Sequence, residues 1–485
     1  MSKDNISKLI EIHFRDYLVG YGGGLEDIDP LSLMTSNRFD LGFKLFYLEM
    51  RKKESVFTRE MYREHIRAFS LGEFTELGQD HKNNIEDYVD SFHNTFEDIE
   101  LNGFDGQKTL IPLSINGSIL NGAHRISSAI YVNINVACAR LNLPCPRYDY
   151  KFFYERKVPE EYLDAAANKF IEYADNVYVA FVWPSARGMD TQLAEIFGKI
   201  IYRKDVSLTY VGAHNLLSQI YCQESWLGRP ENNYSGVRAK LIECFKTFEP
   251  LRVIAFRCDT HAEVIALKEK IRGIFNLGKH SIHITDTKEE AVKAGRLVFN
   301  KNGLHFLNYA QSSRSQSFEM HLLKIKQLIQ CNNINPRDVA FDGGIVLSLY
   351  GLRKASDLDY FLSDSVNLVI DEMGFESHEQ EVLYHGVCKD ELIYNPNLYF
   401  YYDGIKFISF EQVYKMKRAR RGAKDLIDCE LMEALIEENK YKKFKSICLQ
   451  NIHYTQVFLK IKCISLLRWI GLLSLVKRVY RLIYK

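Results

Sequence analysis

One stretch constrains the fold of this chain more than any other, Asp342 to Phe361, with the sequence DGGIVLSLYGLRKASDLDYF. Its Gly-Gly pair enters an apolar run that predicts a helix, and Asp-Leu-Asp follows on a predicted strand. Side chains two positions apart in a strand share a face, so we expect Asp357 and Asp359 to point at one spot. Two such carboxylates can hold a hard divalent cation of the magnesium type.

The glycines before the predicted helix add a second element to this site. Gly343 and Gly344 let backbone amides approach a phosphate at the helix start. The combination predicts phosphoryl or nucleotidyl transfer. The alternative is structural, because Asp residues near a strand end also cap or solvate turns, and Ser356-Asp357 can cap a helix.

These residues resemble the signature of the nucleotidyltransferase-fold superfamily, in which Gly-Gly or Gly-Ser precedes Asp-x-Asp by about a dozen residues. The segment Tyr414 to Leu435, YKMKRARRGAKDLIDCELMEAL, resembles the basic helix ending in Lys-Asp-x-x-Asp of many bacterial members. The resemblance implies an enzyme that uses Mg²⁺ or Mn²⁺ and a nucleoside triphosphate. It implies Asp357 and Asp359 as metal ligands, and Arg353 or Lys424 as the group that neutralises phosphate charge.

Active members of that superfamily usually place a third carboxylate on a later strand. Here the corresponding region, NLYFYYDGIKFISF, predicts two strands joined by an Asp-Gly turn, with Asp403 in the turn itself. As a turn residue Asp403 already has a structural explanation. It is therefore either the third metal ligand or only a turn former, and a degenerate nucleotide-binding domain stays open.

A second compact unit lies between residues 101 and 133, LNGFDGQKTLIPLSINGSILNGAHRISSAIYVN. We predict a strand over 108–113, a tight turn at Asn116-Gly117, a return strand over 118–120 and a helix beginning near His124. A phosphate would suit that helix start, where backbone amides and a guanidinium fork converge. The residues expected there are Asn121, Gly122, His124 and Arg125. The alternative is a capped helix in which Arg125 makes a structural ion pair.

This strand-turn-strand-helix passage resembles the phosphate-binding segment of the ParB/sulfiredoxin superfamily. Gly122, His124 and Arg125 match, whereas Asn121 stands where several relatives have Asp, and Ala123 stands where the reductases have Cys. The resemblance implies nucleotide or phosphate binding and opens a competing function, an ATP-dependent kinase of a small molecule. It does not support sulfinic-acid reduction.

Composition bounds the remaining classes. Lys plus Arg number 63 and Asp plus Glu 62, so no net field favours nucleic acid as a partner. The ten cysteines form no C-x-x-C pair, which indicates free thiols in a reducing cytoplasm. The first residues contain no apolar core with a cleavage site, so we expect no secretion signal.

The chain is expected to be a multidomain α/β and α+β protein. Between 177 and 308, strands alternate with helical stretches, which predicts a central α/β layer with parallel strands. The ParB/sulfiredoxin-like unit precedes this layer, and a nucleotidyltransferase-like mixed sheet with helices follows it. The predicted domains are 1–155, 170–315, 316–440 and a basic amphipathic tail, 441–485.

The basic tail has ten Lys and Arg residues and no Asp or Glu. Polar residues recur every three or four positions among Leu, Ile, Val and Trp, which predicts an amphipathic helix. Within 457–485 the longest uncharged run, 469–476, is too short to span a bilayer. We expect it to lie on an anionic membrane surface, at the inner face of the cell membrane. The alternative is docking on the protein's own core or on another subunit.

Together these patterns predict a cytoplasmic, membrane-associated, bacterial-type transferase acting on a small-molecule or glycan acceptor. Assembly of cell-surface polysaccharide would suit such an enzyme, by analogy only. Two alternatives stay open: a small-molecule kinase that uses the N-terminal unit, and a catalytically inactive nucleotide-binding regulatory protein tethered to membranes.

Overall fold

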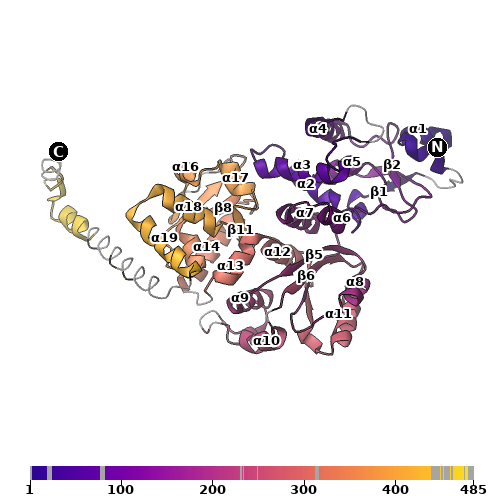
Figure 1. Ribbon diagram of the computed structural model, residues 1–485. Helices are drawn as coiled ribbons and strands as arrows, with labels where there is room; N and C mark the ends of the chain where they lie inside the picture. The colour runs from indigo at the N-terminus through magenta and orange to yellow at the C-terminus, as the bar shows by residue number, and fades with distance from the viewer. Residues whose placement is uncertain are drawn as a thin grey trace. The chain divides into compact units, whose positions relative to one another are not determined.

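The structure is a computed structural model (Figure 1). It describes residues 3–18, 25–76, 82–229, 232, 234–247, 249–311, 316–368, 370, 372–437, 448, 452, 459, 462–474 and 476–478. The described part is a mixed α/β protein with three sheets, of three, five and four strands. Residues 1–379 and 387–409 form one compact unit, and residues 380–386 and 410–485 form a second. The predicted 316–440 domain is thus divided between the two units.

The N-terminal part is a three-stranded sheet with helices packed beside it. The strands lie in the order β1-β3-β2, where β1 is antiparallel and β2 parallel to β3. Aromatic and aliphatic side chains of α2, α3 and α4 form one of its cores. The elements are α1 (Lys3–Leu9), β1 (Glu26–Ile28), α2 (Asp40–Met50), α3 (Val56–Ser70), α4 (Ile85–Asn102), β2 (Ile111–Leu113), α5 (Ala123–Val132) and β3 (Val136–Arg140).

The predicted strand-turn-strand-helix passage is formed in part. The tight turn is present, with Gly117 at a φ of +78°, and α5 begins at Ala123, one residue before the expected start. The first strand, β2, is shorter than predicted. The return strand over 118–120 is wrong, because only one bridge, between Leu113 and Ile119, pairs that segment.

The central part contains a four-stranded sheet in the order β5-β6-β4-β7. All three pairings are antiparallel, so the predicted parallel layer is wrong. Helix α8 connects β4 to β5, and α11 connects β6 to β7. The two strands of each pair run in the same direction but are not neighbours, because β6 lies between β4 and β5, and β4 lies between β6 and β7. This is the split β-α-β arrangement. The elements are β4 (Val177–Val182), α8 (Asp190–Phe197), β5 (Ile200–Val206), α9 (Tyr210–Ile220), α10 (Val237–Cys244), β6 (Leu251–Arg257), α11 (His261–Phe275), β7 (Ile282–Ile284) and α12 (Lys288–Val298).

One face of the central sheet is covered by two helices. Leu193 and Phe197 of α8, with Val264 and Ile271 of α11, pack on alternate residues of β4, β6 and β7. Figure 1 shows α8 and α11 on the same side of this sheet. Alternation along β4 places the next residues on the opposite face, and they too are buried, which explains its uninterrupted apolar sequence.

The third sheet is mixed, in the order β10-β9-β8-β12-β11. Its centre pairs β8 with β9 antiparallel and with β12 parallel. The predicted hairpin is confirmed as β11 and β12, with Asp403 and Gly404 at φ values of +49° and +80° in the turn. The elements are α13 (Lys301–Tyr309), α14 (Gln316–Cys331), β8 (Val339–Asp342), α15 (Gly344–Leu349), β9 (Leu358–Leu362), β10 (Phe375–Ser377), α17 (Lys389–Tyr394), β11 (Tyr399–Tyr402) and β12 (Ile405–Ile408).

The second unit contains α16 (Val382–His385), α18 (Phe410–Arg420) and α19 (Ala423–Ile436). The predicted single basic helix is wrong, because the chain breaks at Arg421, whose φ is +56°. The Lys-Asp-x-x-Asp motif therefore begins α19 instead of ending a basic helix. Buried Lys417 pairs with Asp428 at 2.9 Å and with Asp425 at 3.3 Å, which ties α18 to α19.

Most of the basic tail falls outside the described residues, but a large part of its predicted amphipathic helix lies within them. That helix is formed over 462–469, in the longest described stretch of the tail, 462–474, and is interrupted at Gly471, whose φ is +76°. None of the helices in the described part of the chain is both long and apolar enough to pass through a membrane.

Candidate functional site

Three carboxylates lie side by side across neighbouring strands of the third sheet. Asp359 on β9 is the register partner of Asp342 on β8 and of Glu376 on β10. Register partners project from the same face, so their carboxylates converge. Asp357 precedes β9 by one residue, and alternation places it on that face too. One oxygen each of Asp357, Asp359 and Glu376 lie within 4.8 Å of one another.

His378 links the two buried carboxylates of this row. Its Nδ1 lies 2.9 Å from Asp342 Oδ2, and its Nε2 lies 3.3 Å from Asp359 Oδ1. Burial raises the pKa of Asp359 to about 6, and although His378 opposes this shift, the charges of Asp357 and Asp342 add to it. Carboxylates crowded in this way repel one another, and a cation placed among them would relieve the repulsion.

The Gly-Gly pair lies against the same carboxylates. Gly343 has a φ of +65°, and a Cβ there would lie 2.4 Å from Asp359 Oδ2. A side chain at position 343 would therefore clash with the Asp359 carboxylate, so glycine is needed there whether or not a phosphate binds nearby. The backbone N–H of Gly344 donates to Asp359. A Cβ on Gly344 would lie 3.3 Å from the Arg353 guanidinium and 3.6 Å from Asp357 Oδ1, so these two side chains flank it.

The structure does not bring Asp403 to this site. Since β12 runs parallel to β8, the turn before β12 lies at the opposite end of the sheet from Asp342. There Asp403 pairs with Lys326 and, at 3.6 Å, with Lys293. The third carboxylate beside Asp357 and Asp359 is Glu376 instead. Lys424 lies near the start of α19, in the second compact unit.

The carboxylate set fits a hard divalent cation. All three ligands offer oxygen, as Mg²⁺ and Mn²⁺ prefer. Oxygens that share a magnesium ion at about 2.1 Å lie up to about 4.2 Å apart, so the separations within 4.8 Å need only small side-chain rotations. Asp357 is half-buried and Glu376 is exposed, so an ion reaches them from solvent.

The residues predicted to bind phosphate in the N-terminal unit line a cavity of about 550 Å³. In that cavity Arg125 Nη2 pairs with Glu11 at 2.5 Å, so its guanidinium already has a carboxylate partner. His124 Nε2 lies 3.0 Å from the hydroxyl of Tyr62, and burial holds the pKa of His124 well below its usual value. The four predicted residues that line the cavity are Asn121, Gly122, His124 and Arg125.

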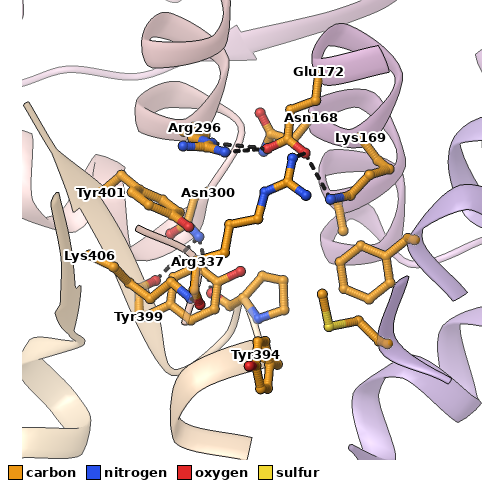
Figure 2. Close-up of a pocket in the computed structure, with 14 residues that line it drawn as sticks. Asn168, Lys169, Glu172, Arg296, Asn300, Arg337, Tyr394, Tyr399, Tyr401 and Lys406 are labelled. Atoms are coloured by element: carbon orange, nitrogen blue, oxygen red, sulfur yellow. Dashed lines mark hydrogen bonds and ion pairs between the residues drawn. The ribbon is translucent and has the colours of Figure 1, made fainter. Parts of the chain in front are cut away.

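A third location gathers buried charges that the sequence did not point to (Figure 2). Glu172 of α7 (Glu160–Tyr173) lies 2.7 Å from Lys169, 2.7 Å from Arg296 and 2.8 Å from Arg337. Although burial favours the neutral acid, these cations hold the pKa of Glu172 below its usual value. The cavity beside them measures about 50 Å³, which suits water rather than a substrate.

Lys406 closes the other side of this small cavity. It is buried and donates to the carbonyl oxygens of Arg337 and Ile393, while its ammonium lies 4.6 Å from the Tyr399 ring centre. Burial lowers the pKa of Lys406 well below its usual value, whereas the aromatic ring favours the charged form. The cluster joins α2, α7, α12 and the third sheet within one compact unit, so its role is structural.

Sequence reasoning missed three members of the carboxylate site: Asp342, Glu376 and His378. The signal for two of them was present, because Glu-Ser-His places Glu376 and His378 on one face of a strand. Nothing local shows that this short strand pairs with β9, since residues 363–374 separate the two strands.

Comparisons of the chain with protein-family models, with curated proteins and with solved structures find no match.

Proposed function

We propose that this protein is a nucleotidyl- or phosphoryl-transferase of the nucleotidyltransferase-fold kind, dependent on Mg²⁺ or Mn²⁺. The observation that carries the proposal is the convergence of oxygens from Asp357, Asp359 and Glu376 within 4.8 Å. The order of elements adds support, because a strand, a Gly-Gly pair, a helix and the Asp-x-Asp strand follow one another as in that superfamily.

In this proposal each residue has a distinct task. When bound, the cation supplies charge neutralisation for the phosphates of a nucleoside triphosphate. Asp357, Asp359 and Glu376 would hold it, while His378 fixes the rotamers of Asp359 and Asp342 by bonding both. Arg353 flanks Gly344 and offers a guanidinium to phosphate oxygens. The acceptor would be a hydroxyl or phosphate group of a small molecule or glycan.

The test uses the purified full-length chain with each ribonucleoside triphosphate, Mg²⁺ or Mn²⁺, and a panel of acceptors. Released pyrophosphate would identify nucleotidyl transfer, and released nucleoside diphosphate would identify phosphoryl transfer. Asp357→Asn and Asp359→Asn should each reduce turnover at least about 100-fold, since charge stabilisation by such an ion amounts to several kcal/mol. Asp364→Asn, an exposed acid paired with Lys389, is the matched control and should leave turnover unchanged.

Mn²⁺ binding followed by electron paramagnetic resonance gives a readout that needs no acceptor. Wild type should bind Mn²⁺, and Asp359→Asn should bind it at least about tenfold more weakly, because a ligand and its charge are lost. Equal Mn²⁺ affinity in the two proteins would contradict the proposed site.

A second candidate function is an ATP-dependent kinase of a small molecule in the N-terminal unit. It is favoured by the cavity of about 550 Å³ that Asn121, Gly122, His124 and Arg125 line. Arg125→Gln and Asp357→Asn separate the two candidates. Nucleotide turnover that depends on Arg125 alone would favour the kinase, and nucleotide binding without turnover would favour a regulatory protein.

A further inference from the structure

The basic tail, residues 441–485, combines a high positive charge with exposed apolar side chains. Its sequence carries ten basic residues and no acidic one. In the described stretch 462–474, every residue except Leu467 and Leu473 is exposed, although most are apolar. Trp469 is 83% exposed and Leu466 is 57% exposed. Large apolar side chains left in water at this density mark an interaction surface.

The backbone geometry of this stretch limits how it can bind. The helix over 462–469 is followed by a turn at Gly471, which has a φ of +76° and whose N–H donates to the Arg468 carbonyl at 3.2 Å. The N–H of Leu472 donates back to Leu467 at 2.9 Å, which closes the helix end. A helical segment of this length cannot cross a bilayer, but it can lie in the plane of one.

We propose that the basic tail docks on an anionic lipid bilayer. Exposed Leu466, Trp469 and Leu472 would enter the boundary between headgroups and acyl chains, where Trp is favoured. Arg468, Lys477 and Arg478 would meet the lipid phosphates, and no acidic residue of the tail opposes them. A bilayer offers both an apolar layer and negative charge, which matches both properties. This inference does not depend on the proposed transferase activity.

Co-sedimentation of the full-length protein with vesicles tests the docking directly. Vesicles of phosphatidylcholine with phosphatidylglycerol should bind the protein, and vesicles of phosphatidylcholine alone should bind it at least about tenfold more weakly. Because each basic residue near an anionic surface strengthens the attraction to it, the triple variant Arg468→Glu, Lys477→Glu, Arg478→Glu should lose at least tenfold in affinity for the anionic vesicles.

A matched control changes the net charge by the same amount at positions outside the tail. Lys52, Lys151 and Lys246 are exposed residues of the first compact unit, and their triple change to Glu should alter vesicle binding less than threefold. A second tail variant, Trp469→Ser with Leu472→Ser, keeps the charge and removes apolar contact, so it should also weaken binding. Circular dichroism of each variant verifies folding.

Three results would overturn the proposal. The first is that anionic vesicles bind no wild-type protein. The second is that the tail variants and the control variant bind these vesicles equally well. The third is self-association, seen by analytical ultracentrifugation, that the tail variants abolish while vesicle binding stays unchanged. That result would assign the apolar surface to a second copy of the chain.

Discussion

Asp359 and Glu376 are register partners on two parallel strands, although sixteen residues of chain lie between them. This pairing brings a third carboxylate to Asp357 and Asp359 on the same face of the sheet. It also makes Asp403 unnecessary there, since that residue lies at the other end of the sheet with Lys326 and Lys293 as partners.

The choice between Glu376 and Asp403 as third carboxylate gives the first prediction. Glu376→Gln removes one charged oxygen ligand and should weaken Mn²⁺ binding at least about tenfold. Asp403→Asn keeps the turn, because Asn also tolerates a positive φ, and should leave Mn²⁺ affinity unchanged. Electron paramagnetic resonance titration of both variants decides the matter. A larger loss in Asp403→Asn than in Glu376→Gln would return the third-ligand role to the turn residue.

Gly343 gives the second prediction, with Gly188 as its control. Both have a φ of +65°, but a Cβ at 343 would lie 2.4 Å from Asp359 Oδ2, whereas a Cβ at 188 would meet nothing within 4 Å. Gly188→Ala should cost only the backbone strain, about 1–2 kcal/mol. Gly343→Ala should cost more, because the ψ of −124° at Gly343 lies outside the left-handed helical region and because the Asp359 carboxylate must move. The displaced carboxylate should also weaken Mn²⁺ binding.

Unfolding midpoints in urea and Mn²⁺ titrations measure the two effects separately. If both alanine variants lose equal stability and retain Mn²⁺ binding, the close packing of Gly343 on Asp359 is not what fixes this carboxylate.

The positions of Asp357 and Asp359 on one face could be predicted from the sequence, whereas the pairing that adds Glu376 could not. Local alternation places Asp357 and Asp359 on one face, and the Asp403-Gly404 turn follows from the conformational freedom of its residues. Which strands pair with each other cannot be predicted from local alternation, because pairing depends on tertiary packing. The same limit explains the central sheet, where an alternation of strands and helices was predicted but the strands were wrongly expected to be parallel: the sequences of β4 and β6 do not show which strand lies beside each.

The buried Glu172 gives the third prediction. It pairs with Lys169, Arg296 and Arg337, so Glu172→Gln would leave these cations partly uncompensated in a buried site. Breaking such a network costs about 3–5 kcal/mol, and denaturant unfolding should show a loss of that size. Glu249→Gln removes an ion pair in which both partners are more than half exposed, and should leave the unfolding midpoint unchanged. Equal midpoints for the two variants would contradict a structural role for the cluster.

The fourth prediction concerns acid stability and His283 on β7. Its ring lies beside those of Phe181 and Tyr221, and burial lowers its pKa to about 3, an effect that Lys268 increases and Asp286 opposes. An unfolded histidine has a pKa of about 6.5, so the unfolded state binds the extra proton between these values. The stability contributed by neutral His283 is therefore complete above about pH 6.5 and is lost as the pH falls toward 3.

His283→Phe removes this titration while keeping an aromatic ring between Phe181 and Tyr221. The loss of thermal stability between pH 7.5 and pH 5 should be smaller in His283→Phe than in wild type. His261→Phe, at an exposed position at the start of α11, should retain the wild-type dependence. Parallel stability curves for wild type and His283→Phe would show that this histidine ionises in the folded protein as readily as in the unfolded chain. In that case burial beside the two aromatic rings would not suppress its charge.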